Sequence, residues 1–416
     1  MSQSHLFCAA FVFAVAFPLS LSAEDTPSPL TTTPPAAGLA AAVANAPSLT
    51  AARARADAAR ARLGSAARFP DPEVEGMISR KNTPDENMPM WEVSVRQPLP
   101  KSGERAADRD RANAVVAMAD AEFSLMAGEM AADTAMALAE AETAQLRAQA
   151  LAAQITRTEQ VLSTVDARIA TGQGRLGDRL ALQTRIAGMQ LMVERDRRMA
   201  EDALSEARGR LGLRPDAPLP AFSAPSPSEI NPDHAPALTV ASAKNAEAQA
   251  MSRMARANAK PMTAVGLRFE REQERMGNND TIGVAFMTEL PWRGRRYARA
   301  EERAAQAEAG AALAEASAAR YRITAALSRV ERAERLAELA RRLAQETQKR
   351  LSADYDTLVR AAGTGGMSNE SSVLMILEVL EKTTDAQLQV IDAEGSVRTA
   401  RAELWRYAPA HSFPNP

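Results

Sequence analysis

Thiols, histidines and aromatic residues are scarce in this chain of 416 residues. Cys8 is the only cysteine, there are three histidines, and aromatic residues make up 4% of the sequence. A single cysteine excludes an intrachain disulfide, and so few histidines leave no recognisable set of a nucleophile with a base or of clustered metal ligands. We therefore predict neither an enzyme nor a bound cofactor.

An excess of charge of either sign is also missing. Lysine and arginine number 50, aspartate and glutamate 52, and the net charge is −2. This balance gives no electrostatic reason to expect nucleic acid as a partner. Hydrophobic residues reach 46% although aromatics are rare, so much of the apolar content is alanine. Alanine suits helices that approach closely, whereas a thick core needs larger side chains, so we expect a thin, long helical structure.

Residues 1–23 have the pattern of an export signal. An uncharged apolar run from Leu6 to Phe17 is followed by small residues up to Ala23, where cleavage is expected. The run is shorter than the roughly 20 apolar residues that a transmembrane helix needs. Cys8 lies inside this segment and lacks the flanking residues of a lipid-attachment site, so no lipidation is expected. Residues 24–38 are expected to form a flexible N-terminus.

The chain repeats one pattern at a spacing of 191 residues (261 − 70). Each copy begins at a proline, Pro70 or Pro261, and continues with two alternating apolar stretches that end in Leu-Pro-x-x-Gly. A long alanine-rich run without internal proline follows each copy and ends near a pair of glycines. Alternation predicts strands, and the alanine-rich runs predict helices of 60 residues or more. The sequence therefore predicts a duplicated unit of β-hairpin and long helical hairpin.

The expected boundaries follow from these patterns and from the prolines. The first repeat, 39–214, contains a helix, strands at about 73–80 and 90–99, a long helix 104–170 and a return helix 175–213. A proline-rich linker, 215–236, separates it from the second repeat. That repeat, 237–408, contains a helix, strands at about 263–272 and 280–290, a long helix 295–362 and a return helix 371–407, followed by a tail, 409–416.

Each predicted strand has one apolar and one charged face. Two small sheets packed on helices would leave the charged face without water and the sheet edges open. The alternative is that several chains close one membrane barrel, with apolar residues toward lipid and polar residues toward a wet lumen. Trp91 and Trp292 suit either an interface girdle or a core. The residues expected to face lipid are Trp91, Val93, Val95, Val265, Leu267, Phe269, Ile282, Val284 and Phe286.

The order of these features resembles the TolC-like outer-membrane efflux proteins. The resemblance spans about Leu39 to Ala408 and depends on the duplicated Leu-Pro-x-x-Gly motifs, the segment from Ala170 to Asp178, and the segment Met375 to Glu381. It implies a homotrimer with a 12-stranded outer-membrane barrel and an α-helical tunnel in the periplasm. It also implies a periplasmic adaptor protein and an inner-membrane pump of the resistance-nodulation-division type as partners.

The Thr-Gly-Gln-Gly segment starting at Thr171 is most similar to channels of heavy-metal efflux systems of the cobalt–zinc–cadmium and copper–silver type. The resemblance thus implies passive export of heavy-metal cations. Drug efflux and type I protein secretion use the same kind of duct and remain open. A soluble periplasmic coiled-coil scaffold with two surface hairpins is the alternative from another class.

The resemblance also implies two kinds of functional residue. Glu378 and Glu381 match acidic positions near the periplasmic mouth, and their spacing places both carboxylates on one helix face. They are the expected gate. For the basic partner that clamps this aperture, Arg360 is the candidate. The tips expected to dock the adaptor contain Gly172, Gly174, Asp178, Gly363 and Gly365; the second tip is longer and richer in glycine than is usual in the family.

Overall fold

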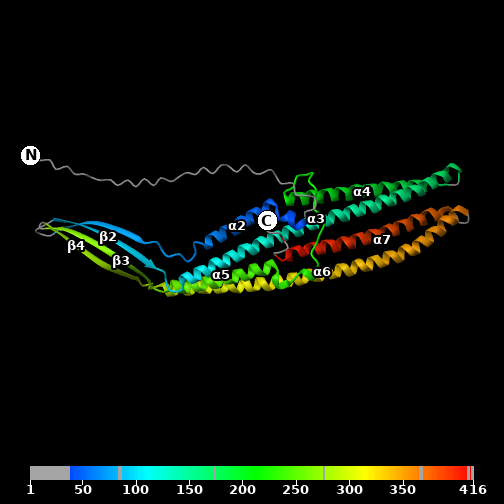
Figure 1. Ribbon diagram of the computed structural model, residues 1–416. Helices are drawn as coiled ribbons and strands as arrows, with labels where there is room; N and C mark the ends of the chain where they lie inside the picture. The colour runs from blue at the N-terminus through cyan, green and yellow to red at the C-terminus, as the bar shows by residue number, and fades with distance from the viewer. Residues whose placement is uncertain are drawn as a thin grey trace, which may run out of the picture. The chain divides into compact units, whose positions relative to one another are not determined.

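The computed structural model describes residues 38–82, 87–172, 174–274, 277–364, 369–409 and 413. The chain divides into two units, Met1–Pro34 and Pro35–Pro416, and all described residues lie in the second. The expected export signal, Cys8 and most of the N-terminal segment therefore lie outside the described residues. The second unit is mainly helical and contains one four-stranded antiparallel sheet (Figure 1).

The duplicated unit of hairpin and helices is confirmed. The elements of the first copy are α1 (Leu39–Ala44), α2 (Pro47–Leu63), β1 (Glu73–Asn82), β2 (Asn87–Leu99), α3 (Glu104–Ala170) and α4 (Leu176–Leu211). Two short 3₁₀ turns, Pro227–Glu229 and Pro232–His234, follow. The second copy has α5 (Pro236–Asn258), β3 (Met262–Glu274), β4 (Gly277–Glu289), α6 (Gly294–Thr364) and α7 (Asn369–Glu403), and a 3₁₀ turn, Leu404–Tyr407, ends it.

The two hairpins form one sheet in the order β1-β2-β3-β4. The register places Val93 opposite Phe269 and Val95 opposite Leu267, so β2 and β3 join the two copies. Gly266 is required at this junction, because a Cβ there would lie 2.5 Å from the Val95 carbonyl oxygen. The outer strands β1 and β4 each pair on one side only within the chain.

The long helices α3 and α6 leave the sheet through the two Leu-Pro-x-x-Gly motifs. Gly103 has a left-handed backbone, with φ of 90°, at the start of α3, which explains why glycine ends the motif. At 1.5 Å per residue, each helix is about 100 Å long. Near the sheet, α5 packs against both α3 and α6. Farther from the sheet, α7 packs against both α3 and α6, and α4 packs against α3. In this part, which is distal to the sheet, the helices therefore lie side by side in the order α4-α3-α7-α6.

The principal core lies where α1, α2, α3, α6, the linker and the C-terminal turn meet. It is rich in alanine, with a few large side chains such as Leu49, Ile323 and Leu404. The indole of Trp405 donates to the carbonyl oxygen of Ser223, at 2.8 Å, and so holds the linker on the helices. The proline-rich segment that connects the two copies is therefore packed against the helices.

Three expected boundaries differ from the structure. The single helix expected from Leu39 is two helices, because Pro47 lacks an N–H donor and instead begins α2 at its first position. The strands extend closer to the hairpin ends, since β3 and β4 pair as far as Glu274 and Gly277. The helix α6 continues to Thr364, so Gly363 belongs to the helix and not to the turn.

Gly128→Ala is expected to destabilise the helical part. A Cβ at Gly128 of α3 would lie 2.7 Å from the carbonyl oxygen of Trp405, a backbone atom that cannot move without repacking the core. Overpacking of this kind costs about 1–3 kcal/mol. Gly188→Ala in α4 is the matched control, because nothing lies within 4 Å of a Cβ there. Thermal unfolding should show a lower midpoint for the first variant only; equal midpoints would contradict the packing.

Candidate functional site

One face of the sheet is apolar and exposed. The register of the three strand pairs aligns the apolar residues into rows that cross all four strands. Leu267 is 63% exposed, and Ile282 and Val284 are each 77% exposed. All nine strand residues expected to face lipid lie on this face, together with Val74 and Ile78. Trp292 lies outside the strands and is 92% exposed, which argues against a core position for it.

An aromatic and ionic group ends this apolar face near the hairpin turns. The rings of Trp91 and Phe269 lie 5.2 Å apart, and the Arg271 guanidinium lies over both. Arg271 also makes a two-pronged ion pair with Asp280, at 2.5 and 2.6 Å. An aromatic–cation group of this kind suits the boundary between an apolar and an aqueous region.

The opposite face of the sheet carries ion pairs. Arg96 contacts Glu75 at 2.5 Å, and Arg268 contacts Glu92 at 2.8 Å and Glu270 at 3.0 Å. Among the strand residues whose side chains are described, this face has more acidic than basic groups. The acidic residues are Glu73, Glu75, Glu92, Glu270, Glu272 and Glu289, and the basic residues are Arg96 and Arg268. The described part of this face is therefore acidic and open to solvent in the single chain.

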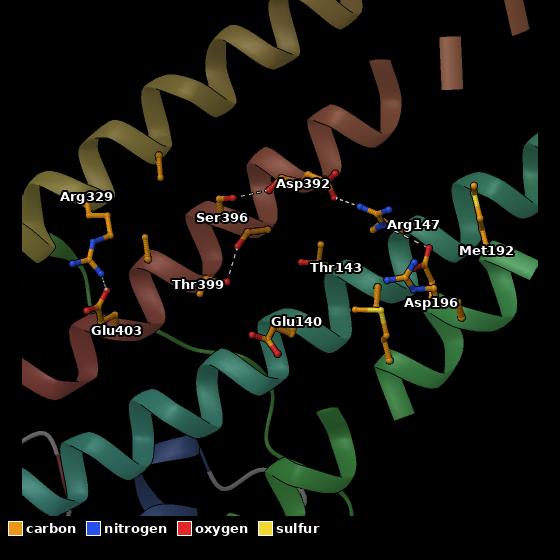
Figure 2. Close-up of a pocket in the computed structure, with 16 residues that line it drawn as sticks. Glu140, Thr143, Arg147, Met192, Asp196, Arg329, Asp392, Ser396, Thr399 and Glu403 are labelled. Atoms are coloured by element: carbon orange, nitrogen blue, oxygen red, sulfur yellow. Dashed lines mark hydrogen bonds and ion pairs between the residues drawn. The ribbon is translucent and has the colours of Figure 1, made fainter. Parts of the chain in front are cut away.

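A groove of about 820 Å³ lies between α3, α4, α6 and α7. Figure 2 shows Arg147 of α3 in this groove between Asp196 of α4 and Asp392 of α7. The distances are 3.5 Å to Asp196 and 2.6 Å to Asp392. Partial burial opposes the charge of Arg147, but the hydrogen bond to Asp392 and the attraction of both carboxylates raise its pKa above the ordinary value. The guanidinium thus joins three helices.

Arg147→Met is expected to destabilise this part of the protein. Asp196 is only 6% exposed, and its Oδ2 has no hydrogen-bond partner in the structure, so Arg147 is the positive charge that offsets it. Removing one partner of a fully buried ion pair costs about 3–5 kcal/mol, and the partial exposure of Arg147 makes the expected loss smaller than that. Adding Asp196→Asn to the variant should recover most of the loss in chemical unfolding. A double variant no more stable than Arg147→Met would contradict this role.

The two carboxylates expected to form a gate are exposed on α7. Glu378 contacts Lys382 of the same helix at 2.6 Å, and Glu381 contacts Arg185 of α4 at 3.0 Å. The hydrogen bond from Lys382, and its charge, lower the pKa of Glu378. Its pairing is therefore complete above the ordinary glutamate pKa and is lost as the pH falls through the lowered value. Buried Ile376 and Leu380 fix this orientation of α7.

The first tip is a tight turn. Gly172 has a φ of 76°, in the region that favours glycine, and its N–H donates to the carbonyl oxygen of Ile169. Gly174 packs so closely on Ile169 that a Cβ would lie 2.6 Å from its side chain. Asp178 lies in the first turn of α4. Of the second tip, Gly365 lies outside the described residues, as does the side chain of Arg360.

Sequence reasoning missed Arg185 and the Arg147 group. The basic partner of Glu381 comes from α4, almost two hundred residues away in sequence, and charged residues are frequent on both helices. The sequence shows only that Arg185 lies in the first half of the return helix. Arginines at such positions are common on solvent-exposed helices, so this position does not single out Arg185 as the partner of Glu381. Helix pairing in three dimensions was needed to select it.

Two searches of the described residues returned nothing. No helix there is both long and apolar enough to cross a membrane. No cluster of three or more His, Cys, Asp or Glu side chains in the same residues is arranged to hold a metal ion.

Comparisons with known proteins agree with this architecture. Residues 39–210 match the outer membrane efflux protein family. No curated protein matches the sequence. The fold is similar to the outer-membrane channel OprN, at 18% identity and a TM-score of 0.70, covering 90% of this chain and 89% of that one.

Two further solved structures share the fold. The outer membrane protein VceC from Vibrio cholerae is 16% identical, with a TM-score of 0.66, over 87% of this chain and 93% of that one. CusC is 16% identical, with a TM-score of 0.64, over 88% and 90%. At these identities the likeness concerns the fold.

The family model thus matches the first repeat of this chain, and the whole fold is that of the outer-membrane channel structures.

Proposed function

We propose that three copies of this chain form a passive exit duct for heavy-metal cations. Each chain would contribute four strands to a 12-stranded barrel and its long helices to a periplasmic tunnel. A periplasmic adaptor would dock at the tips, and an inner-membrane pump of the resistance-nodulation-division type would supply the energy. The single observation that carries the proposal is the two-faced sheet, which is apolar on one side, acidic on the other and unpaired at both edges.

Exposed apolar residues at both edges of the helical layer support the trimer. In the distal part α4 and α6 are the outer helices. On α4, Leu180 is 65% and Leu191 74% exposed, and on α6, Leu336, Leu339 and Leu343 are each about 60% exposed. The last three share one side of α6 by their spacing. Contiguous exposed apolar residues mark an interface, and contact between α4 of one copy and α6 of the next would cover both.

The gate proposal rests on the exposed acidic pair at the distal end. Three copies of Glu378 and Glu381 would place six carboxylates around one axis and raise the local concentration of cations. The contact of Glu381 with Arg185 joins α4 to α7, so the same residue would also restrain the opening of the mouth. Adaptor docking at Gly172, Gly174, Asp178, Gly363 and Gly365 belongs to the same proposal.

Heavy metals are the proposed cargo because both acidic regions favour cations and because the first tip resembles those of metal-efflux channels. A drug-efflux duct and a type I secretion duct remain alternatives with the same architecture. Deleting the gene and measuring growth across zinc, cadmium, cobalt, copper, silver and several drugs separates them. Sensitivity to metals, restored by the intact gene, supports the proposal; sensitivity to drugs alone, or none to any of these, would contradict it.

A further inference from the structure

We propose that the acidic face of the sheet binds a soft monovalent cation, Cu(I) or Ag(I), between the thioethers of Met77 and Met90. The inference rests on the proposed function, because it places a contact for the exported cation on the face that would line the duct. The cation is cargo here and not a resident cofactor.

The methionines of the strands lie on the acidic face of the sheet, although methionine is a hydrophobic residue. Of the strand residues whose side chains are described, the four methionines, Met77, Met90, Met262 and Met287, all lie on the acidic face. The apolar face is built from Val, Leu, Ile, Phe and Trp, with no methionine among its described residues. A methionine that served only as apolar filler would gain more on the apolar side. This placement points to a use for sulfur.

Met77 and Met90 are neighbours on adjacent strands. Met77 of β1 lies opposite Glu92, and Met90 lies two residues before Glu92 on β2. Such diagonal neighbours on one face have Cα atoms about 7–8 Å apart, within reach of long side chains. Met77 is 47% exposed and therefore open to solvent. Two flexible thioethers on adjacent strands can close on one soft ion.

The surroundings of this pair are acidic. Glu92 lies opposite Met77, Glu272 lies opposite Met90, and Glu270 lies opposite Glu92. Among the described side chains, Arg268 contacts Glu92 and Glu270. Carboxylates attract any cation, whereas thioethers favour soft ions such as Cu(I) and Ag(I) over zinc or magnesium. Attraction and selectivity thus come from different side chains.

The second pair of methionines provides a matched control. Met262 and Met287 are also diagonal neighbours on the acidic face, since Met262 lies opposite Glu289. However, Arg96 directs its Nη1 at the sulfur of Met287, at 3.7 Å. A cation at that sulfur would meet a guanidinium, so the second pair should bind silver poorly.

The test is calorimetric titration of silver nitrate into the protein purified in detergent. Cys8→Ser in every version ensures that no thiol is present even where the export signal is retained. Leucine conserves the volume of methionine. Met77→Leu with Met90→Leu should weaken silver binding roughly tenfold or more. Met262→Leu with Met287→Leu should leave it nearly unchanged. Equal losses in both variants, no loss in the first, or no silver binding by the parent protein would overturn the site.

The same preparations separate this inference from the proposed function. One portion of each preparation is reconstituted in a planar bilayer to record conductance, and another portion is titrated with silver. A conducting trimer whose silver binding does not depend on Met77 and Met90 overturns the thioether site and leaves the duct intact. A protein that neither forms trimers nor conducts overturns the duct, whatever its affinity for silver.

Discussion

Leu267→Arg and Val284→Arg are each expected to abolish assembly in the outer membrane. The two residues face each other across β3 and β4 on the apolar face and are 63% and 77% exposed. If lipid covers this face, an arginine near the middle of a strand costs about 2–4 kcal/mol in each chain. Three chains repeat that cost in one barrel. Heat-modifiable trimers extracted from outer membranes should fall to a small fraction of the normal yield.

Thr281→Arg is the matched control for this result. Thr281 is exposed one residue away from Ile282, but it lies on the acidic face opposite Glu270. An arginine there meets water and a carboxylate, so trimer yield should stay near normal. Normal yield from Leu267→Arg and Val284→Arg, or equal loss from all three variants, would contradict the assignment of the two faces.

Glu378→Gln combined with Glu381→Gln is expected to open the periplasmic mouth. The double variant removes six negative charges from a trimer and the three contacts between Glu381 and Arg185. Each exposed pair of this type contributes about 0.2–1 kcal/mol, so three change the open-to-closed ratio by roughly threefold to a hundredfold. Single-channel recording should show higher conductance and weaker block by divalent cations, and cells should admit more of a large antibiotic.

A charge exchange separates the restraint on the mouth from the acidic ring. Arg185→Glu alone sets two carboxylates against each other, so it should increase conductance. Arg185→Glu with Glu381→Arg restores an attractive pair and should return conductance toward normal. If the exchange leaves conductance as high as in the single variant, the contact of α4 with α7 does not restrain the mouth.

Much of the architecture could be predicted because it is repeated and periodic. The alternation around Val93 and Val284 identified two faces of strands, and the alanine-rich runs identified α3 and α6. Residue patterns alone did not predict that the helix expected from Leu39 is interrupted before Pro47. This proline occupies the first position of α2 and divides the expected helix into two. The same patterns also placed Gly363 in a turn, although glycine costs only about 1 kcal/mol in a helix interior and α6 continues through it.

The contacts that join helices were beyond sequence reasoning. Arg147 touches Asp196 and Asp392, and Arg185 touches Glu381, across helices far apart in the chain. Charged residues recur on every solvated helix face, so composition does not select the pairs that meet. The sequence places Met77 near Met90 across the first hairpin, but only the strand register shows that the two share a face with Glu92.

The most direct test of the account is native mass spectrometry of the protein after detergent extraction from outer membranes. Three two-faced sheets with unpaired edges should close on one another, so the account predicts a complex with the mass of three chains. A monomer recovered from the soluble periplasmic fraction would contradict it.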